Sequence, residues 1–370
     1  MNQRPVPFLD LARQHAEMKQ ELSVAFGRVM STSAFILGEE VERFEQEFAS
    51  YCGVEHCVGI ASGTAALTLA LIAAGIGPGD EVIVPAHTFI ASALAIVHAG
   101  AVPVLCDVEE GTGLLDVESA EAVTSDRTAA IIAVHLYGQL CDMEAVGRLG
   151  DRHGILVFED AAQAHGASDS GTKAGAFGTA ASFSFYPSKN LGAIGDAGAI
   201  TTDDAEIAAR ARSLRNLGQR ARGEHLDAGF NERLDGVQAA VLRIKLGRLD
   251  GWNEQRRLRA ASYVDALGDA ARVLEVRNPA ACVYHVFPVR VPDRDGLQSR
   301  LTGAGVETGI HYPLALDGHR ALRDVCIADW DVSRSHAWAA EELSLPMYPG
   351  LAPADIERVS AVCREHAELR

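Results

Sequence analysis

Short apolar segments alternate with helical segments between residues 57 and 185, and this alternation is the strongest constraint on the fold. Each apolar segment is five to seven residues long, and most of the stretches between them have the spacing of a helix. Alternation of this kind predicts a mostly parallel sheet with helices on both faces. No Gly-x-Gly-x-x-Gly motif follows the first segment, which disfavours a dinucleotide-binding fold. The predicted strands are residues 57–61, 81–85, 102–106, 129–135, 155–160 and 181–185.

The second half of the chain has a different pattern of helical and strand-like segments. The helical segments lengthen after residue 203 (206–217, 234–252 and 255–267), and short strand-like runs return after residue 273. A chain of 370 residues is too long for one typical core. We therefore predict a large domain over residues 1–250, which includes an N-terminal helical segment, and a smaller α/β domain over 251–370.

Charge and cysteine usage restrict the partners and the compartment. The net charge of −17 and the pI near 5.2 argue against nucleic acid or an anionic membrane surface as a partner. The seven cysteines contain no Cys-x-x-Cys pair, which indicates buried thiols and no zinc site. The start of the chain has no signal-peptide pattern, and its apolar runs are too short to span a membrane. A soluble cytoplasmic protein without a metal site is expected.

Lys189 is the first candidate for chemistry. Only four of the 33 Lys and Arg residues are lysines. We therefore expect these few lysines to serve in functions that arginine cannot perform. A lysine can lose its proton when its surroundings disfavour the cation, and its neutral amine can attack a carbonyl carbon. Lys189 follows a predicted strand that Pro187 ends, and a glycine-rich loop comes after it (Gly192, Gly195 and Gly198). This setting suits a carbonyl cofactor such as pyridoxal phosphate (PLP), while a solvated loop lysine is the plain alternative.

Three further loops follow predicted strands, where an open parallel sheet binds its ligands. Gly63 and Thr64 open a helix, whose N-terminus attracts a phosphate group. Asp160 ends an apolar strand and could pair with the ring nitrogen of a pyridine, and Phe89 could stack on a flat ring. Each also has an ordinary structural interpretation, as a helix cap or a core aromatic residue. Their coincidence with Lys189 in one sheet favours a PLP site, to which Ser184 could add a hydroxyl for the phosphate.

These segments resemble the DegT-type nucleotide-sugar aminotransferase family, PLP enzymes of fold type I. The resemblance covers nearly the whole chain and implies a seven-stranded, mostly parallel sheet with a smaller C-terminal α/β domain. The motifs that carry it, in order, are VPFLDL, FILG, SGTAAL, GDEVIVPAHTF, HLYGQ, EDAAQAHGA, SFSFYPSKNLG, GFNERLDGVQAAVL, GIHYP and LSLP.

The resemblance also implies roles for individual residues. Lys189 looks like the lysine that forms the Schiff base with PLP, and Asp160 looks like the partner of the pyridinium nitrogen. Asn231 resembles a residue that reaches the phosphate of a neighbouring subunit, which implies a homodimer with shared sites. The remaining assignments are Gln163 near the ring hydroxyl, Phe89 as the stacking residue, Gly63, Thr64 and Ser184 as phosphate ligands, and His311 and Tyr312 in the GIHYP motif as substrate contacts.

The sequence around Lys189 looks most like that of family members that aminate C3 of a dTDP-3-keto-6-deoxyhexose with L-glutamate as amino donor. After GIHYP the chain departs from many sugar-specific relatives, which leaves the exact sugar open. Arg220 and Arg222 lie in an arginine-rich stretch that either binds the sugar-nucleotide pyrophosphate or forms a solvated surface. The alternatives are an enzyme of the same fold that acts on a C4-keto sugar, a cyclitol or an aminoshikimate-type ketone, and a non-catalytic PLP-binding regulator.

Overall fold

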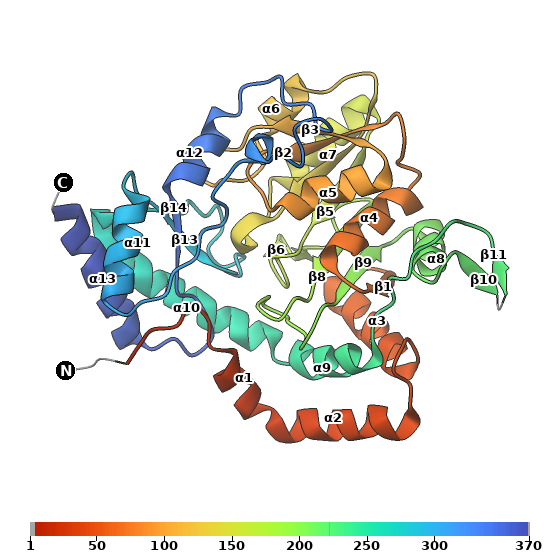
Figure 1. The fold of residues 1–370 in the computed structure, drawn as a ribbon, viewed down its shortest axis with the longest axis horizontal. Coiled ribbons are helices and arrows are strands. Elements are labelled where there is room, and N and C mark those ends of the chain that lie inside the picture. Colours follow the sequence, from red (N-terminus) through yellow and green to blue (C-terminus); the bar gives the residue numbers. More distant parts are fainter. Residues whose placement is uncertain (1–3, 222, 369–370) are drawn as a thin grey trace.

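The computed structural model describes residues 4–221 and 223–368 and is built around a seven-stranded sheet (Figure 1). The strands lie in the order β1-β9-β8-β5-β4-β2-β3. Pairing is parallel from β3 to β8, while β9 is antiparallel to both of its neighbours. The predicted fold class is therefore confirmed. The strands are β1 (His56–Ile60), β2 (Glu81–Pro85), β3 (Val102–Cys106), β4 (Thr128–Val134), β5 (Leu156–Asp160), β8 (Ala180–Ser184) and β9 (Gly198–Thr202).

Two details of the prediction were wrong. Gly198 was expected in a loop, but it begins β9, and a Cβ atom at this position would lie 2.4 Å from the carbonyl oxygen of Ser62. Only glycine permits that approach, and glycine disfavours strands, so the sequence pattern hides the strand. The helix predicted over residues 234–252 is two helices, α9 (Gly236–Leu246) and α10 (Leu249–Leu267), which separate at Gly247.

Helices cover both faces of the large sheet (Figure 1). On one face, α4 packs against β8, β9, α5 and α8, and on the other, α3 packs against β1 and α9, and α7 against β4, β5 and α6. The alternation along β8 matches these two layers, because Phe183 contacts Phe48 of α3 while Ser184 faces α4. The helices are α3 (Glu39–Cys52), α4 (Gly63–Ala73), α5 (Ile90–Ala99), α6 (Val117–Ala122), α7 (Met143–His153) and α8 (Ala205–Leu214).

The C-terminal part has a second sheet and its own apolar core. Strands β12, β13 and β14 pair antiparallel, and α10, α11 and α13 pack beside them. Tyr263, Phe287 and Leu343 are among the buried side chains of this core. The predicted boundary at residue 250 falls at the start of α10 and stays a prediction. The elements are β12 (Arg272–Val273), β13 (Phe287–Arg290), β14 (Glu342–Leu345), α11 (Arg294–Gly303), α12 (Ser333–Glu341) and α13 (Pro353–Glu368).

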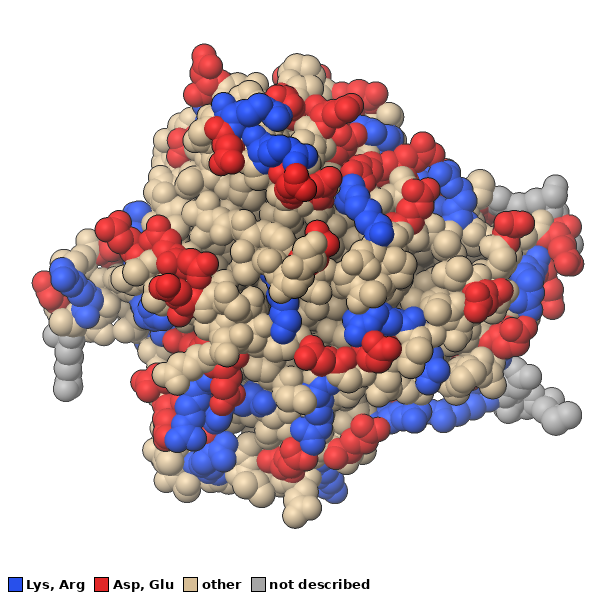
Figure 2. All heavy atoms as spheres, turned by 180° about the vertical axis from the view of Figure 1, so that it is seen from behind, with Lys and Arg blue, Asp and Glu red and all other residues tan. Residues whose placement is uncertain are grey.

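The remaining elements lie at the periphery. Helix α2 packs against α9, and the hairpin β10–β11 projects from the body of the molecule beyond α8 (Figure 1). No helix in the described ranges has the length and apolarity needed to cross a bilayer. Acidic and basic side chains are interspersed on the face opposite to that of Figure 1 (Figure 2). These elements are α1 (Leu11–Glu17), α2 (Lys19–Thr32), β6 (Ser168–Asp169), β7 (Thr172–Lys173), β10 (Gln219–Ala221) and β11 (Glu224–His225).

Candidate active site

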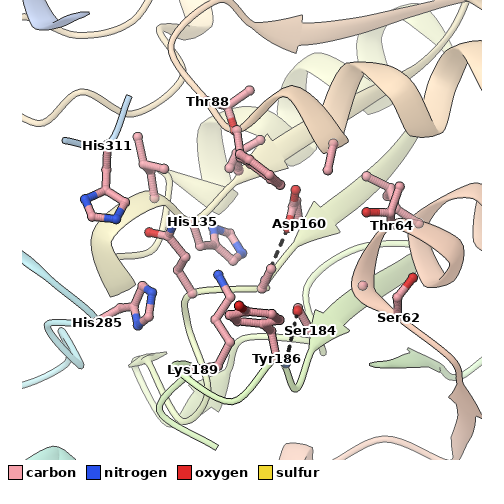
Figure 3. A pocket seen from close by; sticks show the side chains of 18 of the residues that line it. Ser62, Thr64, Thr88, His135, Asp160, Ser184, Tyr186, Lys189, His285 and His311 are labelled. Atoms are coloured by element: carbon pink, nitrogen blue, oxygen red, sulfur yellow. Dashed lines mark hydrogen bonds between the residues drawn. The ribbon is translucent and has the colours of Figure 1, made fainter. Parts of the chain in front are cut away.

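A cavity of about 360 Å³ opens at the carboxyl ends of the parallel strands (Figure 3). Two predicted residues, Arg220 and Asn231, are exposed and do not line it, and Arg222 lies outside the described residues. The structure brings the other predicted residues together in this cavity. They are Gly63, Thr64, Phe89, Asp160, Gln163, Ser184, Lys189, His311 and Tyr312.

One end of the cavity is built by the start of α4. Ser62 caps this helix, and its hydroxyl accepts a hydrogen bond from the backbone N–H of Ala65 at 3.2 Å. The first N–H groups of a helix have no partner within it, and the helix dipole favours negative charge there. A Cβ atom at Gly63 would lie 2.6 Å from Cβ of Ser184, so this position needs glycine to let the strand end and the helix start approach each other. The result is a small, donor-rich seat that suits a phosphate group.

Lys189 stands in the loop that follows β8. Its backbone N–H donates to the carbonyl of Tyr186 at 2.8 Å, which turns the side chain into the cavity. The amine points between Asp160 and His285 and has no hydrogen-bond partner among the described residues (Figure 3). Burial lowers the pKa of Lys189 to about 8, although the nearby Asp160 carboxylate opposes this shift. A substantial fraction of neutral, nucleophilic amine is therefore present near physiological pH.

Asp160 and Glu159 are adjacent on β5 and face opposite sides of the sheet. Asp160 lines the cavity, where the Ser92 hydroxyl donates to Oδ2 at 2.7 Å and the backbone N–H of Ala162 donates to Oδ1 at 3.2 Å. Glu159 is fully buried on the other side, and its carboxylate accepts hydrogen bonds from the His135 ring and from three backbone N–H groups, of residues 175, 177 and 178. Glu159 thus stabilises the fold, while Asp160 keeps a carboxylate available to a ligand.

Aromatic and amide groups close the mouth of the cavity. Phe89 is 51 % exposed, and its ring centre lies 5.2 Å from that of Tyr312. The Gln163 amide donates to the Tyr312 hydroxyl at 3.0 Å and accepts from the backbone N–H of Tyr137 at 2.7 Å. These bonds fix the orientation of Gln163 and tie the GIHYP segment to the loop after β5.

Comparison with known proteins identifies the group to which this arrangement belongs. Residues 16–364 match the profile of the DegT/DnrJ/EryC1/StrS aminotransferase family. The chain belongs to this family. It is therefore an aminotransferase, as the resemblance in the sequence implied.

Individual relatives of the family match over almost the full chain. The dTDP-3-amino-3,4,6-trideoxy-alpha-D-glucose transaminase of Streptomyces venezuelae is 46% identical over 365 residues, which are 98% of this chain and 96% of the relative. The crystal structure of DesV from S. venezuelae in complex with a ketimine intermediate superposes with a TM-score of 0.96 at 44% identity and covers 99% of both chains. NtdA from Bacillus subtilis, solved with bound cofactor PMP, has a TM-score of 0.92 at 28% identity over 100% of this chain and 87% of that one.

The cavity of this aminotransferase fits PLP. A phosphorylated pyridine aldehyde requires three kinds of group, and the cavity supplies each of them. They are the Lys189 amine, which has no hydrogen-bond partner among the described residues, the Asp160 carboxylate, and the N-terminus of α4, where Gly63 permits a close approach. Lys189 would hold its aldehyde carbon, Asp160 its ring nitrogen, and Gly63, Thr64 and Ser184 its phosphate.

His285 is a residue of the site that the sequence did not predict, whereas His311 was predicted. His285 lines the cavity beside Lys189 (Figure 3), yet it comes from the segment before β13 and carries no recognisable motif. Its Nδ1 lies 3.0 Å from Oδ1 of Asn190, whose amide nitrogen donates to the carbonyl of Val283, so Nδ1 of His285 must carry the hydrogen. Burial, and then the neighbouring Lys189, lower the pKa of His285 well below its ordinary value. The ring is therefore neutral.

Proposed function

We propose that this protein is a PLP-dependent aminotransferase that moves the amino group of L-glutamate to a nucleotide-linked keto-deoxysugar. The acceptor that we favour is a dTDP-3-keto-6-deoxyhexose. The supporting relative is the S. venezuelae dTDP-3-amino-3,4,6-trideoxy-alpha-D-glucose transaminase. The observation that carries the proposal is the position of the Lys189 amine, which lies between the Asp160 carboxylate and His285 in one cavity.

The residues of the chain divide the work. PLP, when bound, supplies an electron sink that stabilises negative charge at the carbon losing its proton. Asp160 would keep the ring nitrogen protonated, and Gln163 would contact the ring hydroxyl. The amine of Lys189, once freed by the incoming amino group, would take the proton from Cα of the donor and deliver it to the cofactor carbon that carries the nitrogen. Reversal of the same proton movements with the keto-sugar would complete the cycle.

A homodimer with shared sites is part of the proposal. Asn231 is exposed on this chain and bridges to Asn216, outside the cavity that its own subunit forms. Arg220 stands on the exposed, projecting hairpin β10–β11. Both residues could contact a phosphate or pyrophosphate group only in the cavity of a neighbouring subunit. Arg222 lies outside the described residues, and the proposal for it rests on the sequence alone.

The deciding experiment uses the purified holoenzyme with glutamate and a panel of keto compounds. We expect glutamate to bleach the absorbance of the bound cofactor, and only a nucleotide-linked 3-keto sugar to restore it. Mass spectrometry and NMR of the product should place the new amine at C3. An amine at C4, or turnover of a cyclitol ketone in preference to the nucleotide sugar, would replace the proposed acceptor. The absence of bleaching would reject transamination from glutamate.

A further inference from the structure

A buried carboxylate lies directly behind His311, on the side of the ring away from the cavity. Glu342 begins β14 and is 0 % exposed, and no Lys or Arg side chain of the described residues forms an ion pair with it. Its Oε2 accepts the backbone N–H of His311 at 2.5 Å, and its Oε1 accepts the hydroxyl of Ser344, which is also fully buried. Burial disfavours the charged form and raises the pKa of Glu342 to about 7, although its two hydrogen bonds and the nearby Arg294 charge oppose this shift. The cost of this burial makes a purely space-filling role for Glu342 unattractive.

The hydrogens of this group can be assigned from donor counts. Above pH 7 Glu342 is ionised and both of its oxygens act as acceptors, so the single hydrogen of the Ser344 hydroxyl is used on Glu342. Nδ1 of His311 lies 2.9 Å from the same hydroxyl oxygen and must therefore donate to it. In a neutral imidazole, the other nitrogen then carries a lone pair and no hydrogen. Burial, and then Lys189, lower the pKa of His311 to about 4, so the ring is neutral near pH 7.

The unprotonated nitrogen belongs to the substrate end of the cavity. Nε2 of His311 has no hydrogen-bond partner among the described residues, and the ring lines the cavity. Figure 3 shows His311 and His285 at the end away from Ser62 and Thr64. The ring is held in place, since Phe8 stacks on it with centres 5.9 Å apart. The cavity therefore offers a fixed hydrogen-bond acceptor where a substrate would extend beyond the cofactor.

We propose that Glu342 and Ser344 are positioning residues that hold His311 in the tautomer with an Nε2 lone pair, so that the site selects a hydroxyl-bearing acceptor. A hydroxyl can donate a hydrogen bond to this lone pair. A carboxylate has only acceptors and gains nothing from it. This chain of hydrogen bonds from Glu342 through Ser344 to His311, the relay, thus distinguishes the sugar from the amino donor at Nε2 of His311. This inference rests on the proposed function, because it assumes that the acceptor is a sugar.

Glu342→Gln is the sharpest variant because it reverses the relay while keeping the shape of the side chain. The amide oxygen must accept the backbone N–H of His311, so the amide NH₂ faces Ser344. The Ser344 hydroxyl then accepts from the amide and donates to Nδ1 of His311, which places the ring hydrogen on Nε2. A sugar hydroxyl can still accept from this N–H, whereas a carboxylate, which gained nothing from the lone pair, now gains one hydrogen bond. The KM for the keto-sugar should therefore change by less than about threefold, while the KM for glutamate should fall about tenfold.

Two further variants separate the relay from general damage. Ser344→Ala breaks the chain of hydrogen bonds and releases the tautomer, so it should also lower the KM for glutamate, while Ser344→Thr keeps the hydroxyl and should leave that KM at its native value. Glu81→Gln is the matched control, since Glu81 is a buried carboxylate outside the cavity and should leave the KM for both substrates unchanged. An unchanged KM for glutamate or an equal change in the KM for glutamate and for sugar in Glu342→Gln, or no difference between Ser344→Ala and Ser344→Thr, would overturn the proposal.

The tautomer can also be read without any turnover. In protein carrying ¹⁵N-labelled histidine at about pH 9, where Glu342 is ionised, the His311 signals are those lost in His311→Ala, and we expect the hydrogen on Nδ1 in the native chain and on Nε2 in Glu342→Gln. A native His311 with its hydrogen on Nε2 would overturn the relay whatever the kinetics show. Absence of bleaching by glutamate in the native enzyme would instead reject the proposed function, so the two failures are distinguishable.

Discussion

The two ends of the cavity are built in different ways. At the phosphate end, Gly63, Thr64 and Ser184 belong to short segments that begin or end a regular element, and their backbone geometry creates the site. At the substrate end, His285 and His311 lie in irregular segments of the C-terminal part. Their rings are oriented by Asn190 and Ser344, which are far away in the sequence. The first end is a property of local chain conformation and the second of tertiary packing. Lys189 lies between them and serves both.

Removal of Lys189 should separate the two ends most strongly. In Lys189→Ala, turnover should fall by at least about 10²–10⁴-fold, because the variant lacks both the nucleophile and the acid–base group. The phosphate end should still retain PLP without a covalent bond, which an absorbance spectrum of the dialysed protein would show. Lys19→Ala, at an exposed position, is the control. Near-normal turnover in Lys189→Ala would contradict the assignment.

The adjacent carboxylates of β5 should give opposite phenotypes. Asp160→Asn should lower turnover by roughly 10²–10³-fold with little change in Tm, because it removes the charge facing the cofactor ring while retaining the bonds to Ser92 and Ala162. Glu159→Gln should cost about 3–5 kcal/mol of unfolding free energy, because three backbone donors and the His135 ring lose a charged acceptor. Kinetics and thermal unfolding of both variants check this. A Tm loss in Asp160→Asn that matches that of Glu159→Gln would contradict the division.

The pH dependence of cofactor capture tests the amine itself. The pKa of Lys189 is lowered to about 8 from an ordinary value of about 10.4. The neutral form that attacks the aldehyde is therefore scarce well below pH 8, is half of the population near pH 8, and predominates above it. Stopped-flow absorbance of apoenzyme mixed with PLP should show a rate that rises with pH and levels off above about pH 9. A rate that keeps rising to pH 10 would show that the site does not perturb Lys189.

A methyl group at the phosphate end should weaken cofactor binding and nothing else. In Gly63→Ala the new Cβ would meet Ser184 at 2.6 Å, and overpacking of this kind costs about 1–3 kcal/mol. We expect the Kd for PLP to rise about tenfold or more, with the KM for the keto-sugar unchanged once the cofactor is saturating. Gly147→Ala is the matched control, since a Cβ at this helical position has no neighbour within 4 Å. Parallel changes in both constants would show that the two ends are not independent.

The same contrast explains how much the sequence could predict. The strand–helix alternation and the residues that directly follow strands, such as Asp160 and Lys189, were predictable because both features are local. Strand β9 was missed because close contact with Ser62 demands a glycine that strands otherwise disfavour. His285 and Glu342 were missed because each acts through a contact made only in the folded chain, with Asn190 and His311 respectively. No spacing in the sequence encodes such a contact.

Borohydride reduction of the holoenzyme shows whether the amine of Lys189 holds the cofactor. Reduction would fix PLP covalently to the lysine that binds it, and digestion with peptide mass spectrometry would locate the adduct among the four lysines of the chain. We expect an adduct on Lys189 at close to one per subunit, and none after prior incubation with excess glutamate. An adduct on Lys173 or Lys245, or no adduct in a protein that visibly carries the cofactor, would contradict this assignment.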